Sequence, residues 1–339
     1  MAGGSQSFQK SKVDGYGFER PEDFDFKSYE EFMASYLSVL ARRAQRWKNT
    51  VGDQTTAISK SRKIKRFCRK GIPSDIRADV WMVVSGAEQR RMADPELYQR
   101  LVDNQLDDTH PVQCAINLDI HRTFPENIHF ADTVDANGLR KPLCRVLSAV
   151  AKNNTQVGYC QGLNFIVGLL LLIVRDEDKV FWLMDTLINN ILPGYYFPDM
   201  KALQAEQELV GDVVKWKLPE VAAHMEALGV QWCLVGMKWF ICLFADVMPV
   251  ETVLRIWDCL FFEGTKILHR VALTLVIANK EKILATKTFP EAVDLFRMIV
   301  STPHTQDCHT FMKNIFELTG SFPRSKLEQM REECRKKVK

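Results

Sequence analysis

The sequence GLNFIVGLLLLIV (residues 162–174) is an uncharged run of thirteen residues, around which the neighbouring segments are arranged. A helix that is hydrophobic on all sides lies inside a protein core, so this run predicts a fully buried helix. The preceding residues, GYCQ (158–161), place Gln161 at the N-terminal end of that helix. There the unpaired N–H groups and the positive end of the helix dipole favour anions, and a side chain can project beyond the core. We therefore expect Gln161 to point outward.

A second polar segment follows another helical pattern, INLDIHRTFP (residues 116–125). Ile116 and Ile120 lie one helical turn apart, and Pro125 disfavours the α conformation at Phe124. These signals predict that Arg122 lies in the last turn of a helix. Its side chain is also expected to point outward.

The rest of the chain carries helical spacing and helix-start signals. Ser28 and Glu31 form a capping-box pattern before an amphipathic run, Ser74 is placed to cap the next helix, and Asp94-Pro95 is a typical helix start. No two alternating, strand-like runs are joined by a hairpin turn signal. The sequence therefore predicts an all-α fold.

Composition excludes several classes of protein. The 339 residues are 46% hydrophobic and 26% charged, as in globular proteins, and the net charge of +3 gives no argument for a nucleic-acid partner. The nine cysteines never occur as C-x-x-C and the seven histidines lack ligand spacing, so we expect reduced, mostly buried thiols and no metal. The N-terminus lacks the apolar core of a signal peptide, and the apolar run 162–174 is shorter than the roughly 18 residues that a membrane span needs. These features predict a cytoplasmic protein without a transmembrane segment.

The predicted organisation is one large helical domain with extensions at both ends. Residues 1–24 are expected to be a flexible, loosely draped arm, 25–64 an N-terminal helix and linker, 65–316 the main domain, and 317–339 a C-terminal helix and basic tail. A single unit is expected because no linker rich in Pro, Gly and Ser interrupts the helices. The basic stretch 60–70 is interpreted as a solvated helix face, in preference to a patch for a membrane or an acidic partner.

Three short motifs stand in this order: GIP (71–73) followed by Arg77 and Trp81, I-x-x-D-x-x-R (116–122) and Y-x-Q-G (159–162). Together they resemble the signature of the TBC domain, the family of GTPase-activating proteins for Rab GTPases. RIWD (255–258) resembles a further block of that family. The resemblance covers roughly residues 65–316, and the segment 16–24 resembles one short-chain subgroup of the family.

The resemblance implies an all-helical domain that docks on a GTP-bound Rab and inserts Arg122 as an arginine finger and Gln161 as a glutamine finger. GTP hydrolysis spreads negative charge over the phosphoryl oxygens, so a catalyst mainly has to position water and neutralise charge. A guanidinium is a permanent, forked cation, and a carboxamide can accept a hydrogen bond from water while it donates another to a phosphoryl oxygen.

The resemblance also implies supporting roles for other residues. Asp119 would orient Arg122 or its loop, and Tyr159 would shape the glutamine loop. Arg77 and Trp81 lie one turn apart, as in a common contact between an arginine stem and an aromatic ring, and would support the fold.

The implied activity acts in trans, in vesicle trafficking. The chain has no P-loop, so we expect no GTP hydrolysis by the chain alone and no cofactor of its own, with GTP and Mg²⁺ held by the partner. The protein would reach endomembranes only peripherally, through the Rab. The alternative function is a helical adaptor that binds a Rab without accelerating hydrolysis.

Two less specific interpretations are outweighed by the ordered motifs. An arginine near a helix end usually meets carbonyl groups or a surface carboxylate, and a glutamine before a helix is usually a cap. Cys160 stands between the two candidate residues, but no motif supplies it with a base, which disfavours a thiol enzyme.

Overall fold

The computed structural model describes residues 12–52, 58–131 and 138–338, and it confirms the all-α fold. Within these ranges the only β-type pairing is two isolated bridges near the N-terminus, Val13 with Glu19 and Phe18 with Asn127. Residues 1–11 of the predicted arm, 53–57 of the predicted linker and 339 of the predicted tail lie outside the described residues.

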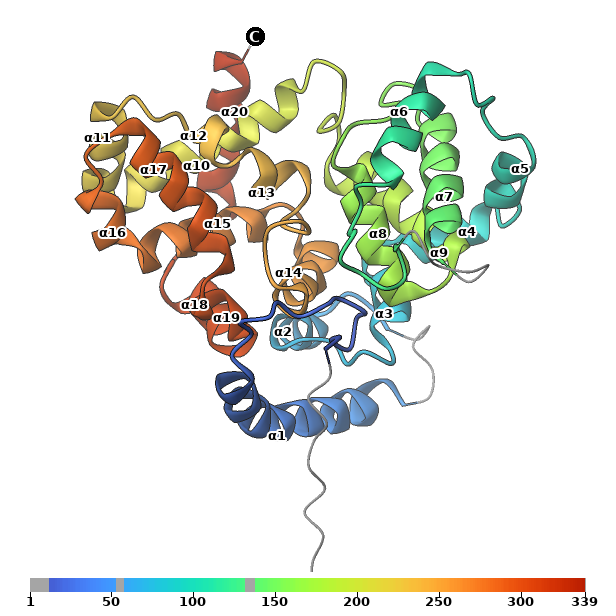
Figure 1. The fold of residues 1–339 in the computed structure, drawn as a ribbon, viewed down its shortest axis with the longest axis horizontal. Helices are drawn as coiled ribbons and strands as arrows, with labels where there is room; N and C mark the ends of the chain where they lie inside the picture. The colour runs from blue at the N-terminus through green and yellow to red at the C-terminus, as the bar shows by residue number, and fades with distance from the viewer. Residues whose placement is uncertain (1–11, 53–57, 132–137, 339) are drawn as a thin grey trace, which may run out of the picture.

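The helices form two groups that meet around α14, and α1 runs beneath α2 in the view of Figure 1. One group contains α4 to α9, and the other contains α10 to α13 and α15 to α20. The elements are α1 (Phe26–Val51), α2 (Arg62–Lys70), α3 (Arg77–Ser85), α4 (Ala87–Ala93), α5 (Leu97–Asp103), α6 (Pro111–Ile120), α7 (Arg140–Asn153), α8 (Leu163–Val174), α9 (Glu177–Thr186), the π-helix η2 (Leu187–Ile191), α10 (Lys201–Lys217), α11 (Pro219–Ala227), α12 (Trp232–Val235), α13 (Met237–Ile241), α14 (Val250–Glu263), α15 (Lys266–Ala278), α16 (Lys280–Ala285), α17 (Phe289–Met298), the 3₁₀-helix η3 (Ile299–Ser301), α18 (Pro303–Gln306), α19 (Cys308–Glu317) and α20 (Arg324–Lys337).

The predicted buried helix is α8. Nine of its twelve residues are buried, and it packs against α3, α6, α7 and α9. The buried hydrophobic side chains form one continuous cluster that extends from Trp47 on α1 to Cys334 on α20. Burial of apolar surface on this scale is the main source of stability, so α1 and α20 share the core of the domain.

Three helix starts differ from the sequence prediction. Asp25 caps α1 by accepting from the backbone N–H of Ser28, so Ser28 lies inside the helix and is not its cap. No side chain caps α3, and Ser74 therefore does not have the predicted role. The α5 helix begins at Leu97, because the Asp94 carboxylate pairs with Arg100 instead of capping a helix at residue 95. Short polar side chains have several local partners, and spacing alone does not choose among them.

The basic stretch is largely the solvated helix face that the sequence predicted. Ser61 caps α2, Ile64 and Phe67 are buried, and five of the seven basic residues are exposed, namely Lys60, Arg62, Lys63, Arg66 and Lys70. Arg69 and Lys65 contact the Glu263 carboxylate at 2.6 and 3.0 Å. Burial opposes the charge of Glu263, but Arg69 and Lys65 lower its pKa, so two of the basic residues tie α2 to the end of α14.

The N-terminal segment also differs from the loosely draped arm that was predicted. Residues 12–24 contact the domain through the bridge between Phe18 and Asn127 and through a hydrogen bond from Tyr16 to Glu251 of α14. Within the described ranges, no group of His, Cys, Asp and Glu side chains could hold a metal ion, and no helix is long and apolar enough to cross a membrane.

Candidate functional site

Arg122 lies two residues beyond the end of α6, not in the last helical turn as predicted. Its backbone N–H still donates to the carbonyl of Asp119 at 3.2 Å, so the chain makes one further turn before it leaves the helix. Phe124, directly before Pro125, leaves the right-handed α region as predicted and has a φ of 48°. This left-handed conformation is rare for a bulky residue, and it turns the arginine loop back onto the protein.

The Arg122 side chain is half exposed and lies against a buried carboxylate. Its Nε donates to Oδ1 of Asp119 at 2.8 Å, and its Nη2 lies 2.5 Å from the same oxygen. The Arg122 side chain is 50% exposed and that of Asp119 only 5% exposed. Asp119 therefore fixes the base of the guanidinium while the rest of the group faces outward.

The glutamine loop reaches the same carboxylate from the other side. Tyr159 donates its hydroxyl to Oδ2 of Asp119, while Gln161, two residues later, is exposed at the N-terminus of α8. Gly162 separates Gln161 from α8 with a φ of 110°, and a Cβ there would lie 3.2 Å from Sγ of Cys242. Only glycine fits this backbone comfortably, so the tight turn sets where Gln161 stands.

A second connection between the loops was not predicted. The side-chain amide of Asn164 donates to Oγ1 of Thr123 at 2.9 Å, and that hydroxyl donates to the backbone carbonyl of Asp119 at 2.7 Å. The Asn164 side-chain oxygen accepts from the N–H of Gly162 at 3.0 Å. Asn164 and Thr123 are fully buried. A polar residue inside an otherwise apolar helix needs a partner, and this signal could have identified Asn164.

Close packing seats the arginine loop on α8. The Phe124 ring packs edge-on against Phe165 at a centroid distance of 5.4 Å and lies 6.0 Å from Phe130. Gly168 makes the approach possible, because a Cβ there would lie 3.0 Å from Cγ2 of Thr123 and 3.1 Å from Cε2 of Phe124. Arg122 and Gln161 thus stand on two loops with a common rigid base.

The Tyr159 phenol and the Cys160 thiol both keep their protons, so neither group is a nucleophile. Burial, together with the hydrogen bond to Asp119, raises the pKa of Tyr159, so the phenol remains a neutral donor. Burial also raises the pKa of the Cys160 thiol to about 11, and the charge of Asp119 acts in the same direction. A protonated, buried thiol is a poor nucleophile.

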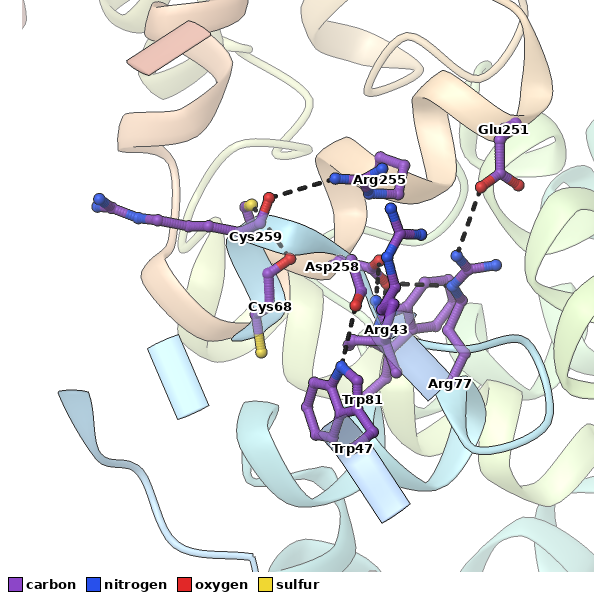
Figure 2. A network of polar contacts seen from close by, with 12 residues as sticks. Arg43, Trp47, Cys68, Arg77, Trp81, Glu251, Arg255, Asp258 and Cys259 are labelled. Carbon is purple, nitrogen blue, oxygen red and sulfur yellow. Dashed lines mark hydrogen bonds and ion pairs between the residues drawn. The ribbon is translucent and has the colours of Figure 1, made fainter. Parts of the chain in front are cut away.

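Arg77 and Trp81 contact a different part of the molecule (Figure 2). Both donate to Oδ1 of Asp258 on α14, Nε of Arg77 at 3.2 Å and Nε1 of Trp81 at 2.9 Å, and Oδ2 accepts from the N–H of Ile72 at 2.9 Å. The two side chains therefore meet at a carboxylate, not as an arginine stem on an aromatic ring. Burial opposes the charge of Arg77, but Asp258 and Glu251 hold its pKa above the ordinary value.

The same buried network attaches α1 (Figure 2). Trp47 donates to the carbonyl of Gly71 at 2.9 Å, and Arg43 and Arg255 both donate to the Tyr36 hydroxyl, at 3.2 and 3.1 Å. Gly71 has a φ of 101°, and a Cβ there would lie 2.5 Å from Nε of Arg255. The GIP motif therefore provides a close backbone approach within a structural network.

Comparison with known proteins assigns this chain to a protein family. A family model for the Rab-GTPase-TBC domain matches residues 74–284, and the chain belongs to that family. Growth hormone-regulated TBC protein 1 of Xenopus laevis is 48% identical over 324 residues, with 96% of this chain and 94% of that protein covered. The protein of the same name from Homo sapiens is 47% identical over 327 residues, with 96% of each chain covered.

Solved structures agree with the family assignment. The Chlamydomonas flagellar RabGAP TBC domain is 30% identical, covers 90% of this chain and 99% of its own, and superposes with a TM-score of 0.76. The Ypt/Rab-GAP domain of Gyp1p, at 18% identity, has the same fold with a TM-score of 0.68, and the alignment covers 83% of this chain and 98% of that domain. The short-chain subgroup that residues 16–24 resemble is that of the growth hormone-regulated TBC proteins.

Proposed function

We propose that this protein accelerates GTP hydrolysis by a Rab GTPase, and that it supplies Arg122 and Gln161 to the partner's nucleotide site. The observation that carries the proposal is the pair of exposed side chains on two loops that share Asp119 as a base. A catalytic pair inserted into another protein has to be exposed and held in a fixed relative position. These residues meet both conditions.

Arg122 would neutralise charge on the transferring phosphoryl group. Asp119 accepts a hydrogen bond from Nε of Arg122 and forms an ion pair with its Nη2, and no described residue pairs with Nη1. The outer edge of the guanidinium can therefore contact phosphate oxygens. An arginine of this kind contributes a factor of about 10³ to 10⁵ in GTPases. Asp119 is a positioning residue in this scheme, because it restricts the guanidinium before docking.

Gln161 would hold the attacking water. Its carboxamide can accept from the water and donate to a phosphoryl oxygen, and the turn at Gly162, with a φ of 110°, places the residue at the start of α8. GTP and Mg²⁺ would both be held by the Rab, and the chain alone would not hydrolyse GTP. Association with endomembranes would follow from binding to a membrane-attached Rab.

Leu118 is a candidate for the docking surface next to the arginine. Its side chain is 77% exposed, four residues before Arg122. An exposed apolar side chain next to a protruding charge is typical of a protein contact. No motif in the sequence marks Leu118.

The test is a single-turnover assay of GTP hydrolysis across a panel of GTP-loaded Rabs, with the wild-type chain and Arg122→Ala. The matched control is Arg297→Ala, because Arg297 also pairs with an aspartate three residues earlier, Asp294, at 3.1 Å, and is exposed. We expect acceleration of at least one Rab by the wild type and the control, and its loss in Arg122→Ala. Binding of a Rab without acceleration by the wild type would favour the adaptor instead.

A further inference from the structure

The N-terminal segment before α1 packs on the loop that carries Arg122, although it lies outside the part of the chain that the family model matches. Three hydrogen bonds join them: Ile128 N–H to the Gly17 carbonyl at 2.9 Å, Glu19 N–H to the Glu126 carbonyl at 3.0 Å, and the Asn127 side-chain amide to the Tyr16 carbonyl at 3.1 Å. We call residues 13–19 the N-terminal brace. In Figure 1 it is the dark blue segment that passes between α14 and the loop after α6.

An aromatic contact extends this pairing into the core. The Phe18 ring packs edge-on against Phe124 at a centroid distance of 5.2 Å, on the loop that Phe165 of α8 contacts at 5.4 Å. Phe124 is buried and has the left-handed backbone described above. Such a conformation persists only when the surrounding contacts hold it, and the N-terminal brace supplies contacts that α8 does not.

The brace has its own local structure. The Asp14 carboxylate accepts from the N–H groups of Tyr16 and Phe18 at 2.8 and 2.9 Å, which closes a tight turn. Gly17 has a φ of 94°, and a Cβ there would lie 2.8 Å from Cδ2 of His129 and 3.0 Å from Oδ1 of Asn127. The turn therefore needs glycine both for its backbone angle and for its approach to the arginine loop.

The other side of the brace contacts the buried core. The Tyr16 hydroxyl donates to Glu251 of α14, whose other carboxylate oxygen lies 3.9 Å from Nη2 of Arg77. Burial and the charge of Glu251 raise the pKa of Tyr16, which keeps the phenol a neutral donor. The brace thus connects the arginine loop to a rigid helix that bears no catalytic residue.

We infer that the N-terminal brace is a positioning element for catalysis. It holds the loop of residues 123–130 and thereby fixes the position of Arg122 relative to α8. This inference rests on the proposed function. The brace contacts Phe124, Asn127 and Ile128, so its effect on Arg122 passes through these residues. Loss of the brace should leave docking intact and lower the rate of hydrolysis within the docked complex.

The test compares Gly17→Ala with Gly15→Ala in the full chain. Gly15 lies in the same turn, but a Cβ there has no atom within 4 Å, so Gly15→Ala changes composition equally without disturbing the brace. We expect Gly17→Ala to lower the maximal rate of Rab-stimulated hydrolysis by roughly 10-fold to 100-fold, the range that an ångström-scale misplacement costs, with an unchanged KM for the Rab. Phe18→Ala should act in the same direction, and Phe18→Tyr should retain the wild-type rate.

A second measurement separates the brace from the proposed function. Hydrogen exchange in peptides covering residues 123–130 should be faster in Gly17→Ala and Phe18→Ala than in Gly15→Ala, while exchange in α14 stays unchanged. This readout needs no Rab, so it tests the brace even if the wild-type chain accelerates no GTPase. Unchanged exchange in the loop overturns the inference, and so does faster exchange with an unchanged maximal rate.

Discussion

Two arginine–aspartate pairs of this protein, Arg122 with Asp119 and Arg77 with Asp258, lie in opposite surroundings. The Arg122 side chain is 50% exposed and leans on Asp119, whereas Arg77 and Asp258 are 3% and 0% exposed. Asp258 shares its oxygens with Trp81 and the backbone, so the Arg77 pair joins α3 to α14. Asp119 shares its oxygens with Tyr159, so the Arg122 pair joins two loops and leaves part of the guanidinium facing outward.

The difference separates stability from activity. A fully buried pair that loses one partner leaves an uncompensated charge in the core, whereas a pair whose arginine is half exposed lies partly in water and contributes less to folding. We therefore expect substitutions at Arg77 to affect folding and substitutions at Arg122 to affect hydrolysis.

The largest effect is expected from Arg122→Ala. It should lower Rab-stimulated hydrolysis on the order of 10³-fold or more, equivalent to about 4 kcal/mol of transition-state stabilisation. Arg122→Lys should restore little of this activity, because an ammonium keeps the charge but loses the fork. Chemical denaturation should show that the free energy of unfolding falls by no more than about 1.5–3 kcal/mol, the cost of a lost hydrogen bond to a charged group, because Tyr159 still donates to Asp119. A loss as large as that of a fully buried pair, about 3–5 kcal/mol, would place Arg122 in the structural class instead.

Arg77→Ala should have the converse effect. Asp258 would keep its burial and lose its cationic neighbour, so the free energy of unfolding should fall by about 3–5 kcal/mol, measured by urea denaturation. The folded fraction of this variant should still accelerate a Rab at close to the wild-type rate. Wild-type stability of Arg77→Ala would refute the structural role of the Asp258 network.

Tyr159→Phe tests the link between the two loops. It removes the donor to Oδ2 of Asp119, and loss of a hydrogen bond to a charged group costs about 1.5–3 kcal/mol. The maximal rate of hydrolysis should fall roughly 10-fold with an unchanged KM for the Rab, measured under single-turnover conditions. The control is Tyr29→Phe, on the exposed part of α1, which should be indistinguishable from the wild type. An equal effect in both variants would show that the Asp119 contact is unimportant.

The smallest effect is expected from Leu118→Ser. The residue is exposed and takes no part in the Asp119 contacts, so the free energy of unfolding and the maximal rate should not change. The KM for the Rab should rise several-fold, because a truncated contact at an interface typically costs about 1 kcal/mol. An unchanged KM would place the docking surface elsewhere.

The sequence predicted the elements of the site better than their connections. An uncharged run of thirteen residues is sufficient to identify α8, and the glycine and proline beside the loops were sufficient to predict that Gln161 and Arg122 face outward. The partner of Arg77 is Asp258, 181 residues away, and such a long-range pairing leaves no local pattern in one sequence. The bond from Asn164 to Thr123 across 41 residues was missed for the same reason.

The contacts of the N-terminal segment were not predicted, because its composition is that of a flexible arm although residues 13–19 form a specific turn. Glycine and short polar residues are typical of a mobile arm, but here Gly17 has the positive φ of a specific turn, which Asp14 closes. The apolar anchors, Tyr16 and Phe18, are too few to form a helical or strand pattern, and their contacts with Glu251 and Phe124 depend on the tertiary fold.

The most direct test of the central claim is a comparison of two Rab proteins, the wild type and a variant whose own switch glutamine is replaced by alanine. If Gln161 holds the attacking water, as proposed, the Rab's own glutamine is dispensable. Single-turnover hydrolysis by the Rab variant should then still be accelerated by the wild-type chain, and Gln161→Ala should abolish that acceleration. Loss of all response by the Rab variant, together with near-normal activity of Gln161→Ala on the wild-type Rab, would leave Arg122 as the sole catalytic contribution and contradict the account.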